Sequence, residues 1–184
     1  MVEPGTPETL DPPASHNFLE RLMGALRLDA AIYAEVEHDP NATGQAAGVV
    51  ILTAVAAGFG APGAGLEAIP GSVLGSLLGW LVSTWLIWVI GVVWMKHSSD
   101  YPELLRTLGF ASAPQIFMVF GLVAKAEWIV LIAALWSLAA YVIAVREALD
   151  VTTGRAIAVC LISFGVKVFI MALLILMTGG IPGS

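Results

Sequence analysis

The chain has 184 residues, of which 58% are hydrophobic and 12% are charged, and its mean hydropathy is +0.88. Soluble domains carry about 25% charged residues, so this composition excludes an ordinary water-soluble fold. The formal net charge is −6, and the scattered basic residues form no patch, which excludes a nucleic-acid partner. A single cysteine, Cys160, excludes a disulfide framework and a thiolate metal site.

The chain begins with an acidic, proline-rich stretch over residues 1–15. This composition is the opposite of a basic segment followed by an apolar one, so it does not predict a signal peptide. We expect a disordered tail here, and we expect an internal segment to direct membrane insertion.

Residues 16–39 show a helical pattern of apolar side chains separated by charged ones. The apolar positions are Phe18, Leu19, Leu22, Met23, Leu26, Ile32, Tyr33 and Val36. Their spacing of three and four residues predicts an amphipathic helical segment, which is cytoplasmic or interfacial. It either lies on the membrane surface or packs against the protein's own membrane helices.

Five apolar segments follow between residues 40 and 178, and a short tail over 179–184 ends the chain. They cover about 40–61, 72–95, 104–124, 127–145 and 155–178. A helix of about 20 residues crosses the hydrocarbon core of a bilayer. The sequence therefore predicts an all-α polytopic membrane protein, a compact bundle of five transmembrane helices with an N-terminal amphipathic helix.

The distribution of Lys and Arg predicts how the bundle is oriented. If the N-terminus is cytoplasmic, Arg21, Arg27, Lys96, Arg106, Arg146 and Arg155 share that side. The opposite side then holds Lys125. We therefore expect a cytoplasmic N-terminus and a C-terminus on the far side.

The second apolar segment carries four small residues at four-residue intervals, Gly71, Gly75, Gly79 and Ser83. This glycine ridge forms one smooth helix face, and small residues allow membrane helices to approach closely. It predicts packing within the chain or, alternatively, between two copies of the chain.

The third segment contains the unusual stretch LRTLGFASAPQIF. Pro114 would free the backbone carbonyl of Phe110 from its helical hydrogen bond, and in lipid that carbonyl needs a partner within the protein. Gly109 and the neighbouring alanines leave room for another helix. The stretch therefore predicts a kinked segment that faces protein.

Lys167 places a charge about 18 Å along the last segment from Arg155, at 1.5 Å per residue. A charge inside the membrane is a candidate functional residue. Three interpretations remain open: its amine snorkels toward Glu127 or the headgroups, donates a hydrogen bond to the Phe110 carbonyl or a near neighbour, or lines a solute pathway.

The order of these features resembles the Yip family of small membrane proteins, named for binding Ypt/Rab GTPases. The resemblance rests on Gly109-Phe110 followed by Pro114, and on the WSLAAYVIAVREALDVTTGRA passage. It implies a multispan fold and, in eukaryotic relatives, binding of prenylated Rab proteins through the cytoplasmic segment. This chain has only Asp39-Pro40 where an Asp-Leu-Tyr-Gly-Pro-like motif is expected. That difference argues against Rab-type GTPase binding and favours the prokaryotic branch of the family.

The leading functional hypothesis is a non-enzymatic integral membrane protein that acts as a scaffold, shapes the membrane or serves a larger complex. The alternative is a small transporter or channel that uses Lys167 and the third segment kinked at Pro114. The three histidines fall outside the apolar segments, and no catalytic residue, cofactor or metal is expected. Expected partners are the bilayer of a prokaryotic cytoplasmic membrane, other membrane proteins and a second copy of the chain.

Overall fold

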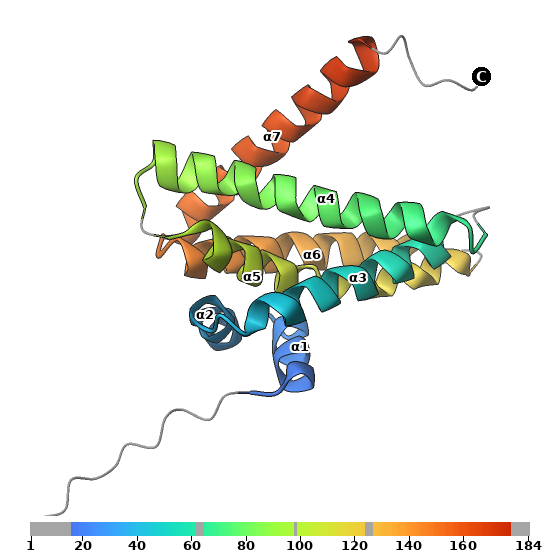
Figure 1. Ribbon diagram of the computed structural model, residues 1–184, viewed down its shortest axis with the longest axis horizontal. Coiled ribbons are helices and arrows are strands. Elements are labelled where there is room, and N and C mark those ends of the chain that lie inside the picture. Colours follow the sequence, from blue (N-terminus) through green and yellow to red (C-terminus); the bar gives the residue numbers. More distant parts are fainter. Residues whose placement is uncertain (1–15, 62–64, 98, 124–126, 178–184) are drawn as a thin grey trace, which may run out of the picture.

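The computed structural model describes residues 16–61, 65–97, 99–123 and 127–177, which are helical with no β-strand (Figure 1). In chain order the elements are α1 (Phe18–Leu26), α2 (Ala30–His38), α3 (Ala42–Gly60), α4 (Ala68–Trp88), the π-helix η1 (Val89–Trp94), α5 (Tyr101–Ala111), the 3-10 helix η2 (Ala113–Leu122), α6 (Glu127–Ala148) and α7 (Thr153–Met177). Lys125 and the tails predicted for residues 1–15 and 179–184 lie outside the described residues.

Within this described part, five helical stretches are long and apolar enough to cross a membrane. They are Ala42–Gly60, Ala68–Trp94, Tyr101–Leu122, Glu127–Ala148 and Thr153–Met177. The prediction of an all-α bundle with five membrane spans is therefore confirmed. The third span contains α5 and η2, and the second contains α4 and η1.

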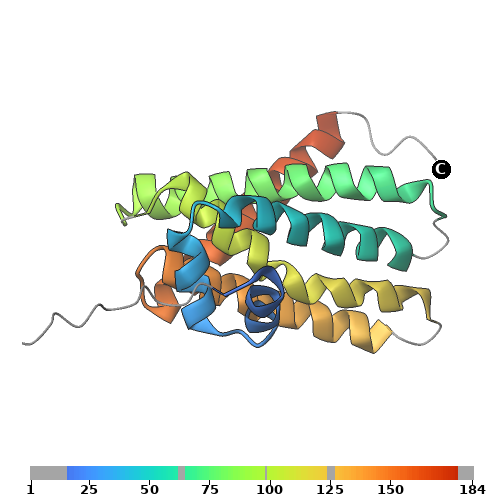
Figure 2. The ribbon, with the colours of Figure 1, turned by 60° about the horizontal axis from the view of Figure 1, so that its bottom comes forward.

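Four of the spans run alongside one another, and α7 diverges from them. Figure 2 shows α3 and α4 as neighbours on one side of the bundle, with η2 and α6 on the other. The C-terminal half of α7 projects away from this bundle (Figure 1). In an 18-residue stretch of the third span 56% of the residues are buried, against 12% for α7. The third span is thus the centre of the bundle and α7 its edge.

The third span packs directly against α3 at two places where a glycine brings the two backbones into contact. At one end, a Cβ atom added to Gly109 would lie 2.7 Å from the Cβ of Ala46. At the other end, a Cβ on Gly60 would overlap the Met118 carbonyl, and one on Gly121 would overlap the Gly60 carbonyl. Only glycine permits backbones to approach this closely.

Side-chain hydrogen bonds to backbone carbonyls hold α4 in place. Ser72 donates to the carbonyl of Ala54 in α3 at 2.7 Å. The indole N–H of Trp80 donates to the carbonyl of Leu105 in α5 at 3.1 Å. In lipid such bonds also satisfy donors that would otherwise have no partner.

The predicted kink at Pro114 is a change of helix type. The α-helix ends at Ala111, and Pro114 lies in the first turn of η2, where its missing N–H removes no α-helical bond. Ser112 closes the end of α5, because its backbone N–H and its hydroxyl both donate to the Gly109 carbonyl, at 3.2 and 2.6 Å. The carbonyls at this helix end therefore find donors within their own turn.

We expect Gly109→Val to lower the free energy of unfolding by about 1 to 3 kcal/mol, the usual cost of overpacking a well-filled site. The cause is the overlap with Ala46, so Ala46→Gly should restore part of the loss. Thermal unfolding of the detergent-solubilised chain measures both effects. Gly165→Val is the matched control, because nothing lies within 4 Å of a Cβ at Gly165. Equal losses in Gly109→Val and Gly165→Val would contradict the packing described here.

Candidate functional site

A polar cavity lies inside the membrane part of the bundle, between α3, α4, η2, α6 and α7. It consists of two spaces of about 290 and 170 Å³ that share four lining residues, Ser83, Gln115, Tyr141 and Lys167. The other polar lining residues are Thr53, Ser76, Ser112, Ser137, Cys160 and Ser163. Among the residues that the structure describes, Lys167 is the only charged one in either lining, so these residues give the cavity a positive charge without a carboxylate. This intramembrane cavity is the candidate functional site.

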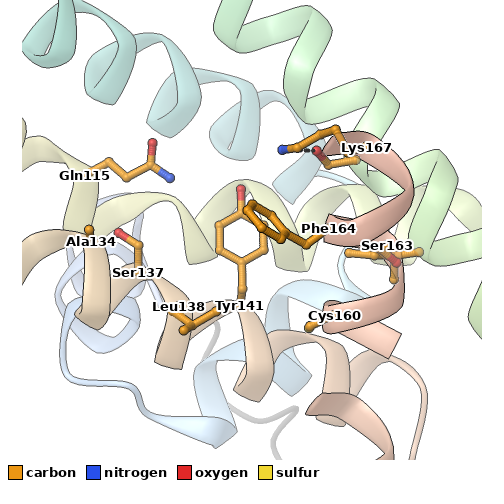
Figure 3. Close-up of a pocket in the computed structure, with 11 residues that line it drawn as sticks. Gln115, Ala134, Ser137, Leu138, Tyr141, Cys160, Ser163, Phe164 and Lys167 are labelled. Atoms are coloured by element: carbon orange, nitrogen blue, oxygen red, sulfur yellow. Dashed lines mark hydrogen bonds between the residues drawn. The ribbon is translucent and has the colours of Figure 1, made fainter. Parts of the chain in front are cut away.

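Lys167 reaches into the cavity from α7 toward α4 (Figure 3). Its amine donates to the hydroxyl of Ser83 at 3.4 Å, which is long for a hydrogen bond. The predicted bond from Lys167 to the Phe110 carbonyl is therefore wrong. Counting residues placed the two groups at similar depth, but depth does not determine which neighbour a side chain faces.

Gln115 and Tyr141 point into the same space as Lys167 (Figure 3). Neither the Gln115 amide nor the Tyr141 hydroxyl has a hydrogen-bond partner among the described residues. By contrast, the hydroxyls of Ser137 and Ser163 donate to carbonyls one turn earlier, at 2.8 and 2.7 Å. The Gln115 amide and the Tyr141 phenol are thus free polar groups of the cavity.

The cavity opens toward the outside of the bundle between α6 and α7. Ala134, Leu138 and Phe164 line this mouth, and all three side chains are exposed. Because the surrounding helices are membrane spans, the mouth faces lipid. Lys167 is itself exposed, so its amine can be reached through the opening.

The three glycines of the α4 ridge do not pack against the other described residues. Nothing lies within 4 Å of a Cβ built on Gly71, Gly75 or Gly79. The fourth member, Ser83, accepts the bond from Lys167, and Gly79 lines the cavity. The expectation that these glycines pack within the chain is wrong. The close approach between α3 and α4 uses Gly58 instead, where a Cβ would lie 3.2 Å from the Ser72 side chain.

The motif residues of the third span lie beside the cavity and not in its lining. Gly109, Phe110 and Pro114 are all buried, and Gly109 contacts α3. Their effect on the site is indirect, because the turn they form places Ser112 and Gln115 in the lining. Sequence reasoning missed Gln115 and Tyr141 as site residues. An amide directly after Pro114 in an apolar span was the available signal.

Comparison with known proteins identifies the family. A family model, the Yip1 domain, matches residues 30–176. The chain belongs to the Yip1 domain family. This confirms the resemblance drawn from Gly109, Phe110 and Pro114. No curated protein and no solved structure matches the chain.

The Yip1 domain match begins at α2, and α1 and α2 pack on the membrane spans through two buried arginines. Arg21, which is 2% exposed, donates to Glu35, Asp39 and Gln45 at 2.7–3.1 Å. Arg106 of α5 donates to the backbone carbonyls of Val36 and Glu37.

Of the two placements expected for the N-terminal segment, the structure shows the one against the protein's own spans. The helical pair packs against the protein's own spans, as the two arginine networks show. The outer face of α1 nevertheless leaves Leu19 and Met23 exposed, 65% and 48% respectively. These two residues are four positions apart and form one apolar face, which suits contact with a membrane surface.

In α2 the pKa values of two carboxyl groups, Glu35 and Glu37, are shifted in opposite directions. Burial raises the pKa of Glu35, but hydrogen bonds from His16 and Arg21 outweigh this and leave it below its usual value of 4.5. Burial raises the pKa of Glu37 to about 7. His38 opposes that shift, and Glu103, Asp150 and Glu147 add to it.

We expect the stability of the folded chain to fall between about pH 4.5 and pH 7. The folded state holds the Glu37 proton more tightly than the unfolded state does. The stabilisation that this proton gives is therefore complete below pH 4.5 and is lost as the pH rises to about 7. Glu37→Gln should flatten the decline in thermal unfolding measured against pH. Glu35→Gln should leave it in place, because the pKa of Glu35 lies below this window. A decline that persists unchanged in Glu37→Gln would contradict the assignment.

Proposed function

We propose that this Yip1-domain protein is a non-enzymatic membrane scaffold that binds a transmembrane helix of another integral membrane protein. The observation that carries the proposal is α7, whose described side chains from Phe164 to Met177 are exposed apart from that of Val166, which is half-buried. A helix that only completed its own bundle would bury one face along its whole length. The C-terminal half of α7 projects away from the bundle and instead exposes an apolar helix surface to a neighbouring protein in the membrane.

The glycine ridge supports the same proposal. Apolar side chains in lipid gain little from mutual contact, so helices associate mainly where small residues let their backbones approach. Gly71, Gly75 and Gly79 provide such a surface on α4, and no described residue lies within 4 Å of a Cβ built on any of them. The exposed half of α7 and the glycine ridge of α4 are thus two surfaces on which a transmembrane helix of another protein can pack.

The scaffold is proposed to lie in a prokaryotic cytoplasmic membrane with its N-terminus inside and its C-terminus on the far side. Support comes from the basic residues Arg21, Lys96, Arg106, Arg146 and Arg155, which the five-span fold gathers at one end. Binding of a Rab-type GTPase is not part of the proposal. The buried arginines of the N-terminal segment are already engaged within the chain.

Transport of a small solute is a second candidate, and one observation favours it. The intramembrane cavity holds a charged residue, Lys167, near the middle of α7. Transporters place their substrate sites at this depth. Solute flux into liposomes that disappears in Lys167→Leu would favour transport over the scaffold.

The scaffold proposal predicts cross-links from the ridge to another membrane protein. A photoreactive amino acid at Gly75 has room, because nothing lies within 4 Å there. We expect it to give a discrete adduct with a different integral membrane protein when the full chain is irradiated in native membranes. Gly79→Ile should reduce that adduct severalfold, because it adds a branched side chain to the smooth face.

Leu131 of α6 is the control position, since it is 60% exposed and lies outside the lining of the intramembrane cavity. The same probe there should give no discrete adduct. An adduct between two copies of the chain would replace the proposal by self-association. Equal labelling from Gly75 and Leu131, or an adduct insensitive to Gly79→Ile, would contradict it.

A further inference from the structure

The charge balance of the intramembrane cavity is incomplete. Lys167 contributes a cation, and no Asp or Glu stands among the described residues of the lining. Ser83, its neighbour at 3.4 Å, is neutral and cannot compensate the charge. An ammonium group within a membrane is costly unless it is paired, so the site favours a ligand that supplies a negative charge.

The free polar groups around Lys167 suit an acidic headgroup. The amide of Gln115 and the hydroxyls of Tyr141 and Ser83 can all donate hydrogen bonds, and they line both spaces together with the lysine. A carboxylate or phosphate accepts several such bonds at once, and bonds to an ionised acceptor are about twice as strong as neutral ones. The lining therefore matches an anion better than a neutral or cationic group.

The position and size of the cavity indicate how such an anion arrives. The mouth is apolar and faces lipid through Ala134, Leu138 and Phe164. A space of about 290 Å³ accepts a headgroup but not an entire lipid. A tail attached to the headgroup would remain outside, along the exposed apolar surface of α7. A freely soluble anion would have no reason to enter from this side.

We propose that the intramembrane cavity binds the acidic headgroup of an anionic amphiphile, with Lys167 as its charge partner and Gln115, Tyr141 and Ser83 as hydrogen-bond donors. The amphiphile enters sideways from the bilayer between α6 and α7. Its acid is a phosphate if the source is a phospholipid and a carboxylate if the source is a free fatty acid. The cavity adjoins the proposed scaffold surface, because Gly79 and Ser83 of the glycine ridge also line it, whereas Gly71 and Gly75 lie outside the lining. The headgroup proposal does not rest on the scaffold function.

Native mass spectrometry of the full chain in a neutral detergent tests the proposal. The probes are dioleoyl phosphatidic acid and oleate as anionic amphiphiles, dioleoyl phosphatidylcholine and oleyl alcohol as their counterparts without net charge, and inorganic phosphate as the soluble anion. We expect one anionic amphiphile per chain and at least tenfold weaker binding of both counterparts. Comparison of phosphatidic acid with oleate distinguishes the two sources.

Substitutions then locate the site. Lys167→Leu should weaken anionic amphiphile binding about tenfold or more, the usual range for a bond to a charged group. Tyr141→Phe keeps the ring and removes the hydroxyl alone, so it should weaken binding about tenfold in a chain that still folds, because the lost bond goes to an ionised headgroup. Lys96→Gln is the matched control for general electrostatic attraction, because Lys96 is exposed and outside the cavity, and it should leave binding unchanged.

Three results would overturn the proposal. The first is equal affinity of the wild-type chain and Lys167→Leu for both anionic amphiphiles, with Tyr141→Phe also unchanged. The second is equal binding of the anionic probes and their counterparts without net charge. The third is Lys167-dependent binding of inorganic phosphate without binding of either anionic amphiphile, which would make the cavity a site for a soluble anion.

Discussion

The direct contact of α3 with the third span determines how the rest of the membrane bundle is arranged. Lipid offers no hydrophobic force to join apolar helices, so their positions depend on where backbones can approach. Gly109 permits this contact against Ala46 at one end, and Gly60 and Gly121 permit it at the other. With both ends fixed, the turn between α5 and η2 has one position, and Ser112 and Gln115 face the centre of the bundle.

The cavity follows from this arrangement together with the direction of α7. The other spans surround the third one, whereas α7 packs along its first half and then diverges (Figure 1). Its departure leaves a space beside α4 and α6, which Lys167 enters from one side and Tyr141 from the other (Figure 3). Lys167, an exposed residue of α7, thus lies next to polar groups of three other spans.

The fold could be predicted from the sequence because hydropathy over about 20 residues reports directly on membrane spans. The family motif could be recognised for a similar reason, since Gly109 and Pro114 have strong local effects on backbone packing. The partners of the glycine ridge and of Lys167 could not be predicted. Residue counting gives depth along a helix, but it does not give the direction in which α7 leaves the bundle. The sequence marks Gln115 as a polar residue in an apolar span, but it does not show that Gln115 and Tyr141 lie beside Lys167.

Thermal unfolding of three glycine-to-alanine variants tests the contact of α3 with the third span most directly. A Cβ at Gly60 or Gly121 would overlap a backbone carbonyl of the facing span, whereas no described residue lies within 4 Å of a Cβ at Gly48 of α3. We expect Gly60→Ala and Gly121→Ala to lower the unfolding temperature, and Gly48→Ala to leave it unchanged or raise it, because alanine favours the helix. Equal effects of the three substitutions, or a loss only in Gly48→Ala, would contradict this contact.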